Sequence, residues 1–352
     1  MMTTQHTYDW NYFSKLAKKI LMPLLILSIA LSLGCGKEES NVNMKVKNGV
    51  LNGVFYQPQG RDLKISSSEW DRRLKLLKDA GVETIYIQWT KYELCVFEEG
   101  DDRLVKDTCS YPLTKIVMKY AKKHKLKVVL GLFSDTNYFT EIQTQNEMFL
   151  TEYLSKLRIR YKISAESLAK TFGTSSAFAG WYLPEEIDDL HWNTLNRQVI
   201  LKEHLDKTYA ILNNLKSKSA KVYISSFFSA NTTPNYYGKM WSFLTRTSPF
   251  VVLVQDTAGI TSTPVSAENK ILFIQAVSSA IPANKEWGVI FEIFQQDGIN
   301  FRAARNDKFL TKHQIKALDL KHKPTYKIAF SLRYLFEDND RLLKEYVRRN
   351  QQ

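Results

Sequence analysis

The segment "GVIFEIF", residues 288–294, is an apolar run interrupted by one carboxylate, Glu292. Valine, isoleucine and phenylalanine favour extended structure, and a strand that is apolar along its whole length is typical of a parallel sheet covered on both faces. The segment therefore predicts a buried parallel strand. An unpaired buried charge is costly, so a glutamate at this place needs a reason.

Seven other segments share this β-rich character and predict strands, and amphipathic segments lie between most of them. The predicted strands are 52–57, 83–89, 127–133, 177–183, 221–227, 250–256, 288–294 and 326–332, and the predicted helices are 67–81, 113–124, 146–171, 194–217, 268–281, 308–320 and 338–349. Eight strand–helix units in one chain of this length predict a single (β/α)8 TIM barrel. An open doubly wound sheet is the alternative, but "QPQGRD" after the first strand is not a phosphate-binding loop.

Catalytic groups of such barrels lie at the carboxyl ends of the strands, where Glu292 falls. The segment "FAGWYLPEEIDDL", residues 178–190, places Glu185 and Glu186 after the fourth strand. Strands four and seven lie across the barrel from each other. Hydrolysis of a glycosidic bond requires two carboxyl groups on opposite sides of the bond. The sequence therefore predicts a two-carboxylate site.

This arrangement is similar to the largest clan of retaining glycoside hydrolases, which carry the acid/base after strand four and the nucleophile after strand seven. The resemblance implies that Glu186 is the acid/base and Glu292 the nucleophile. Pro184 precedes the acidic pair, whereas that clan has an asparagine before its glutamate.

Four motifs carry a closer resemblance: "NGVFYQP", "GWYLPEEID", "LVQDTAGI" and "FEIFQQ". With them the chain, over most of Leu51 to Tyr346, resembles a family of exported bacterial barrel proteins that is described as a domain of unknown function and treated as glycoside hydrolases. In that family the glutamate before an apolar residue in "GWYLPxEI" looks like the acid. This maps onto Glu186 and leaves Glu185 at the variable position.

Two other interpretations stay open. "LPEEIDD" is also an ordinary helix start, with proline in the first turn and acids that complement the helix dipole. Glu292 could instead pair with a lysine or arginine in the core, and a shift of one residue in register would turn it outward.

Polar and aromatic residues recur at the strand ends and are candidates for binding sugar hydroxyls or sugar faces. The candidate substrate-binding residues are Gln57, Gln88, Trp89, Asp135, Tyr182, Gln255, Asp256 and Phe294. We expect an oligosaccharide or polysaccharide substrate. The alternative function is a barrel that binds polysaccharide without cutting it, as an accessory lipoprotein of the envelope.

The first 34 residues predict an export signal, with lysines before the apolar run "ILMPLLILSIALSL". "LSLGC" resembles a bacterial lipoprotein box and implies that Cys35 is lipidated. Residues 35–49 then form a flexible tether, and 50–352 the barrel domain. Gly36 favours the outer membrane over the inner. An uncleaved membrane anchor is the alternative.

Cys95 and Cys109 lie within a polar connection and predict a disulfide, with two free thiols as the alternative. The six histidines form no HExxH motif, so we expect no metal site, and we expect no cofactor. The net charge is +13, but the basic residues are scattered over predicted helix ends without an aromatic patch. We therefore expect no nucleic-acid partner, and a monomer.

Overall fold

Eight parallel strands close into a barrel in the computed structural model, which describes residues 50–92, 95–96, 113–215, 220–260, 265–298, 300–316 and 318–351. The strands are β1 (Gly53–Tyr56), β2 (Thr84–Ile87), β5 (Lys127–Gly131), β7 (Phe178–Ile187), β8 (Lys221–Ser226), β9 (Val251–Gln255), β10 (Trp287–Glu292) and β13 (Tyr326–Phe330). β1 pairs with β13 and closes the ring. The predicted (β/α)8 barrel and all eight of its strands are confirmed.

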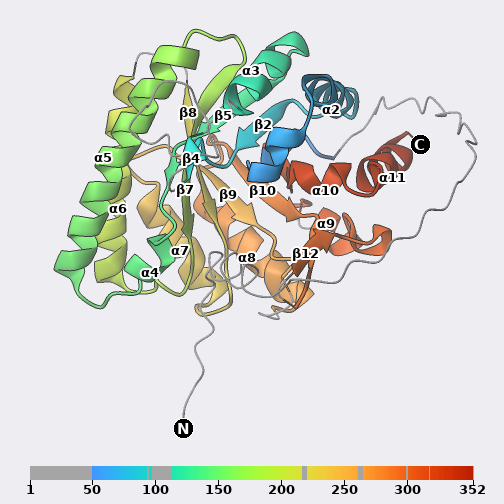
Figure 1. The fold of residues 1–352 in the computed structure, drawn as a ribbon. Helices are drawn as coiled ribbons and strands as arrows, with labels where there is room; N and C mark the ends of the chain where they lie inside the picture. Colours follow the sequence, from blue (N-terminus) through green and yellow to red (C-terminus); the bar gives the residue numbers. More distant parts are fainter. Residues whose placement is uncertain are drawn as a thin grey trace, which may run out of the picture.

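Helices surround the strands, with α5 and α6 side by side along one flank (Figure 1). They are α2 (Ser67–Asp79), α3 (Leu113–Lys123), α4 (Tyr138–Glu141), α5 (Glu147–Phe172), α6 (Leu195–Asn214), α7 (Pro234–Leu244), α8 (Ala267–Ala280), α9 (Lys312–Lys316), α10 (Leu332–Phe336) and α11 (Arg341–Asn350). Ser66, Asn146 and Ser266 each accept a backbone N–H at the start of a long helix, which defines where α2, α5 and α8 begin.

The predicted helices differ from the structure in one extent and in three omissions. The helix predicted over 308–320 is wrong in extent, since that segment contains the end of a short 3-10 turn (Asn306–Lys308) and then only α9. The short helices α4 and α10 were not predicted. Neither was α7, although Thr233 caps it and Pro234 occupies its first turn.

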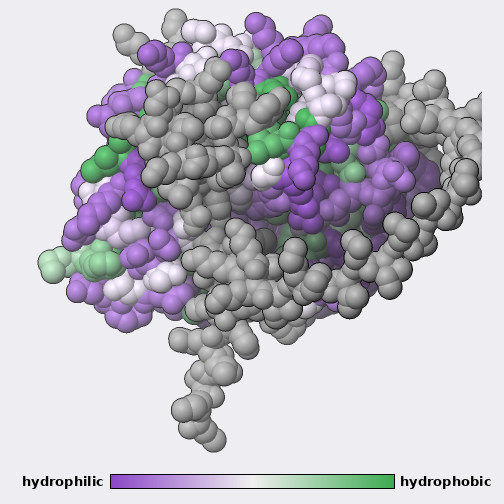
Figure 2. Space-filling model, in the orientation of Figure 1, coloured by the Kyte–Doolittle hydropathy of each residue, from purple (hydrophilic) through white to green (hydrophobic). Residues whose placement is uncertain are grey.

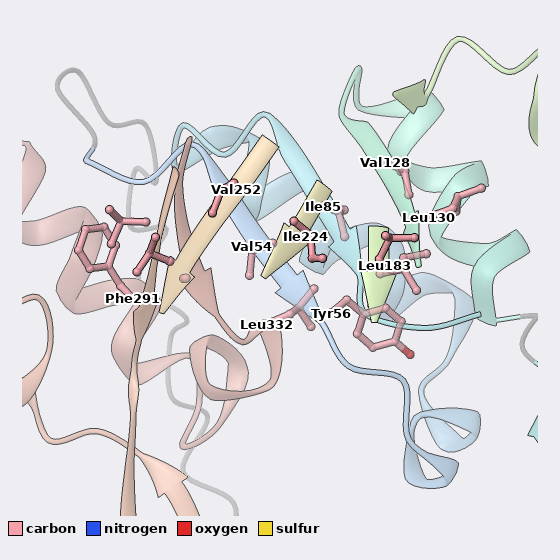
Figure 3. Close-up of a cluster of buried hydrophobic side chains, with 14 of the residues drawn as sticks. Val54, Tyr56, Ile85, Val128, Leu130, Leu183, Ile224, Val252, Phe291 and Leu332 are labelled. Carbon is pink, nitrogen blue, oxygen red and sulfur yellow. The ribbon is translucent and has the colours of Figure 1, made fainter. Parts of the chain in front are cut away.

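Side chains alternate between the two faces of the barrel strands. Nine residues pack together in the interior: Phe55, Tyr86, Val129, Tyr182, Tyr223, Val251, Leu253, Ile290 and Ile328. Their sequence neighbours point outward against the helices, as Figure 3 shows for Val54, Ile85, Val128, Leu183, Ile224, Val252 and Phe291. This alternation explains why the strands are apolar along their whole length. It also determines which residues beyond each strand face the mouth of the barrel.

Two small sheets extend from the carboxyl ends of the strands. β3 (Lys91–Tyr92), β4 (Cys95–Val96) and β6 (Phe133–Ser134) form one, and the hairpin of β11 (Phe294–Asp297) and β12 (Asn300–Ala303) forms the other. Because they follow β2, β5 and β10, they build up the rim of the barrel at the end where catalytic groups are expected.

Several predictions fall outside the described residues: the export signal 1–34, the lipidated Cys35, the tether to residue 49, Cys109 and the side chain of Cys95. The disulfide therefore stays a prediction. Among the described helices, none has the length and apolar content needed to cross a membrane. The described surface visible in Figure 2 is mostly hydrophilic.

Candidate active site

Strand β7 carries Glu186 into the mouth of the barrel. The strand continues through Ile187, and its pairing with β8 shifts between Leu183, which pairs with Ile224, and Glu186, which pairs with Ser225. Tyr182 packs in the barrel interior, and side chains alternate along a strand. Glu186 therefore faces the mouth of the barrel, and Glu185 faces outward toward the helices. The helix-start interpretation of this segment is wrong.

Glu185 lies against the helices. His204 of α6 donates a 2.7 Å hydrogen bond from Nε2 to Glu185 Oε1, and the two side chains are 0% and 1% exposed, respectively. A carboxylate enclosed in this way cannot reach a substrate at the mouth. The structure therefore removes Glu185 from the candidate catalytic residues and assigns it a structural pair.

Glu292 is the last residue of β10 and pairs in register with Phe330 of β13. Ile290 lies in the interior cluster, so Glu292, two residues later, faces the mouth. The backbone N–H of Gly259 donates a 2.8 Å hydrogen bond to Glu292 Oε2. Within the described part of the chain, no lysine or arginine lies within ion-pair distance of Glu292, so the structure does not show the alternative core ion pair.

Gly259 must be a glycine to make this bond. A Cβ at that position would lie 2.7 Å from the backbone oxygen of Phe294 and equally close to its ring. The missing side chain allows the loop after β9 to approach β11, and this approach brings the Gly259 N–H to Glu292.

The electrostatics of the site follow from burial. Burial raises the pKa of Glu186 to about 7, while a hydrogen bond from Gln255 opposes the rise. Burial, and then the charge of Asp256, raises the pKa of Glu292 to about 8, and the charge of Glu186 adds to this rise. Glu186 and Glu292 are therefore within electrostatic reach of each other. Because their charges repel, the site retains at least one proton near neutral pH.

Two predicted binding residues support the carboxylates directly. Gln255 donates a 3.1 Å hydrogen bond from Nε2 to Glu186 Oε1. Asp256 is turned outward and buried, and its Oδ1 accepts the backbone N–H of Glu292 at 3.0 Å. Asp256 thus acts on Glu292 and does not face a substrate.

Two predicted aromatic residues are packing residues. Tyr182 lies on the floor of the mouth, where its hydroxyl is 2.7 Å from Ser225 Oγ and its ring is 5.1 Å from that of Phe55. Phe294 is 4% exposed, with its ring 5.5 Å from that of Tyr334. Neither presents an open face to a sugar.

The other four predicted binding residues differ from one another. Gln88 is 7% exposed, and its Oε1 has no hydrogen-bond partner among the described residues, which suits a substrate hydroxyl. Gln57 follows β1 at the rim and accepts a 3.4 Å bond from Gln59. Trp89 packs on the outer core, and Asp135 accepts a 3.1 Å bond from Arg160 of α5. Asp135 is therefore already neutralised.

Three further residues of the site were not predicted from the sequence. Gly259 lies in the quoted motif "LVQDTAGI", but only its backbone N–H takes part. Gln314 of α9 donates a 2.8 Å hydrogen bond to Asp256 Oδ2. Tyr334 of α10 lies within reach of the charge of Glu292, which contributes to its raised pKa. No cluster of three potential metal ligands occurs among the described residues.

The fold and the site define a (β/α)8 barrel with two carboxyl groups at the carboxyl ends of the fourth and seventh strands. The chain belongs to the family described as "Domain of unknown function (DUF4434)", whose model matches residues 51–330. This match covers the whole barrel from β1 to β13, including both carboxylates.

The chain is also similar to individual proteins, by sequence or by structure. It is 28% identical over 293 residues to "Uncharacterized protein YbcH" of Escherichia coli K12, covering 81% of this chain and 90% of that protein. The structure of a candidate alpha-L-fucosidase from Bacteroides thetaiotaomicron has a TM-score of 0.64 and 17% identity, covering 90% of this chain and 99% of that one. A chitinase-like agglutinin from Robinia pseudoacacia has a TM-score of 0.50 and 10% identity, covering 85% and 99%. At these identities the two structures show the shared fold.

Proposed function

We propose that this protein hydrolyses glycosidic bonds of a cell-envelope or extracellular polysaccharide by a retaining, two-carboxylate mechanism. The observation that carries the proposal is the pair of inward-facing carboxyl groups, Glu186 on β7 and Glu292 on β10, each within electrostatic reach of the other. Two carboxyl groups that share a proton near neutral pH are what such hydrolysis requires.

In the first step the carboxylate of Glu292 attacks the anomeric carbon. The bond from that carbon to the leaving oxygen breaks, and Glu186 gives its proton to that oxygen. A glycosyl ester of Glu292 results. In the second step Glu186 takes a proton from water as the water oxygen attacks the same carbon, which releases Glu292 and the sugar.

The roles are assigned from the places of the two carboxyl groups. In the clan of retaining glycoside hydrolases that this arrangement resembles, the acid/base follows the fourth strand and the nucleophile follows the seventh, which gives Glu186 the first role and Glu292 the second. The Gly259 N–H and the charge of Lys270 favour the ionised form of Glu292, but burial and Asp256 outweigh them and raise its pKa above that of Glu186. The assignment therefore rests on position, and the two Glu→Gln variants test it.

The test is hydrolysis of a panel of polysaccharides and aryl glycosides by the wild type and by Glu292→Gln. We expect the substitution to abolish turnover without lowering Tm, because glutamine keeps the shape and can still accept the Gly259 N–H. The anomer released first, observed by ¹H NMR, should have the configuration of the substrate. Release of the opposite anomer would show that the mechanism is inverting and not retaining.

The same panel separates hydrolysis from binding alone. One similar structure is described as an agglutinin, so a barrel of this shape can be a binding protein. If the wild type binds a polysaccharide and the product mixture shows no cleavage of any substrate in the panel, the protein is a binding lipoprotein and the catalytic assignment is wrong.

We also propose that Cys35 is lipidated and anchors the protein in the bacterial envelope, in the outer membrane. The apolar run and "LSLGC" support this. Metabolic labelling with a fatty-acid analogue should mark the wild type and not Cys35→Ser. Equal labelling of both chains would contradict the anchor.

A further inference from the structure

A pocket of about 200 Å³ opens beside the mouth of the barrel, at the carboxyl ends of the neighbouring strands β1 and β13. Its charged lining has three guanidinium groups against two carboxyl groups. The polar residues that matter here are Gln57, Arg61, Asp62, Arg73, Arg333 and Glu337.

Both carboxyl groups of the pocket accept hydrogen bonds from the protein. Asp62 Oδ2 accepts the hydroxyl of Tyr56 at 3.0 Å and the backbone N–H of Gln59 at 2.9 Å. Glu337 accepts Arg333 Nε at 2.6 Å on one oxygen and the backbone N–H of Ala303 at 3.1 Å on the other. Neither carboxylate forms an ion pair with Arg61 among the described residues, although the charges of both act on it.

The three arginines are not equivalent. Arg73 is held by Glu69 at 2.7 Å, and Arg333 by Glu337. Arg61 is exposed, and among the described residues it has no hydrogen bond or ion pair. Partial burial and the charge of Arg333 lower the pKa of Arg61, so the structure holds two like charges near each other. An anion placed between them would relieve this repulsion.

The pocket adjoins the proposed catalytic centre. Phe330 of β13 pairs in register with Glu292 on one side and with Phe55 on the other. Phe55 therefore lies about two strand spacings, ~10 Å, from Glu292, and Gln57 lies two residues, about 7 Å, further along the chain. Tyr334 lies between the two regions, because the charges of Arg61, Arg333 and Glu292 all affect the pKa of its phenol. A sugar attacked by Glu292 could therefore reach the pocket with a substituent.

We propose that Arg61 and Arg333, with Gln57, form a subsite for the anionic substituent of an acidic sugar, a uronate carboxylate or a sulfate ester. This inference rests on the proposed function for its placement beside Glu292 and names the substrate class, an acidic glycan. Arg333 is fixed in place by Glu337, whereas Arg61 keeps its full set of donors for the ligand.

The test measures binding by titration calorimetry and NMR, with D-glucuronate, inorganic sulfate and neutral D-glucose as probes. It uses the wild type, Glu292→Gln, Arg61→Gln, and Lys64→Gln as a matched control. Lys64 is exposed in the same 3-10 turn, Gly60–Lys64, and does not line the pocket. We expect saturable binding of glucuronate or sulfate, stronger than that of glucose, weakened at least tenfold by Arg61→Gln and unchanged by Lys64→Gln. The stronger of the two anions identifies the substituent.

The failures of the two proposals are distinguishable. If glucuronate and sulfate show no saturable binding in the millimolar range, or bind Arg61→Gln as well as the wild type, the anionic subsite is wrong even where neutral glycans are hydrolysed. Glu292→Gln should bind the anions like the wild type, because this substitution leaves the pocket intact. If the wild type binds the anions but cleaves no substrate in the panel, the anionic subsite stands and the proposed hydrolysis is wrong.

Discussion

The backbone N–H of Glu292 donates a 3.0 Å hydrogen bond to Oδ1 of Asp256, so the residue that raises the pKa of Glu292 also fixes its position. Gln314 Nε2 binds the second oxygen of Asp256 at 2.8 Å, and the backbone N–H of Ala258 adds a bond to the first at 3.1 Å. Asp256 is therefore a positioning residue, buried behind the proposed nucleophile.

Substitution of Asp256 by asparagine keeps an acceptor for the Glu292 N–H and removes the charge. Because that charge raises the pKa of Glu292 to about 8, we expect the limb of the kcat/KM profile near pH 8, which follows the titration of Glu292, to move to lower pH by about one unit. Gln314→Ala is the control, since it removes a hydrogen bond from Asp256 and leaves the charge. If Asp256→Asn lowered Tm and left this limb of the pH profile in place, Asp256 would have a purely structural role.

Substitution of Glu186 by glutamine removes the proton donor. We expect kcat on substrates with poor leaving groups to fall by about 10²–10⁴-fold, since proton donation contributes that much. Dinitrophenyl glycosides need no such proton and should lose far less. The fall in activity on the alkaline side of the pH profile should disappear, because Glu186, whose pKa burial raises to about 7, can no longer lose its proton. Azide should restore turnover of the activated substrate. An equal loss on both substrate types would remove Glu186 from the role of acid.

Much of the fold was predictable because each barrel strand buries both faces, which leaves an uninterrupted apolar run in the sequence. Helix α7 was not predicted, although its buried residues Tyr237, Met240, Trp241 and Leu244 recur at helical spacing. Gly238 is there for packing: a Cβ would lie 2.9 Å from the backbone oxygen of Ala276 in α8. Close contact between distant segments leaves no periodic signal.

In the candidate site, too, some residues were predictable from the sequence and others depend on tertiary contacts. Glu186 and Glu292 were predictable from their places at strand ends. Which of Glu185 and Glu186 faces the mouth depends on the facing of β7 and on its pairing with β8, which shifts between Leu183 and Glu186. Arg61 and Tyr334 come from segments after β1 and β13, and only the closed barrel brings them near Glu292. Such neighbours follow from the tertiary structure.

The raised pKa values also predict how stability depends on pH. Protonated Glu186 and Glu292 are favoured in the folded state, so their contribution is complete below about pH 4.5 and is lost as the pH rises through about 7 and 8. Glu186→Gln and Glu292→Gln cannot ionise there. We expect each to be more stable than the wild type at pH 9, by on the order of 2 kcal/mol, and nearly equal to it at pH 4.

Urea unfolding at pH 4, 7 and 9 measures this difference. Glu166→Gln is a suitable control, because it removes a carboxylate whose side chain is 51% exposed on α5, far from a buried site. A gain in stability that is the same at pH 4 and pH 9 in the two site variants would contradict the assigned pKa shifts.

The last prediction separates the two adjacent glutamates. Glu185 and His204 are both buried and joined at 2.7 Å, so removing one partner leaves the other without compensation. We expect Glu185→Ala to cost about 3–5 kcal/mol in the free energy of unfolding, measured in urea, with kcat of the folded protein nearly unchanged. The double variant Glu185→Leu/His204→Leu should recover part of that stability, because it removes both members of the pair, and only part because Tyr161 still loses its hydrogen bond to Glu185. Glu186→Ala should show the reverse pattern, with activity lost and stability kept. If Glu185→Ala abolished turnover while its unfolding curve matched the wild type, Glu185 would be the acid and the facing of β7 described above would be wrong.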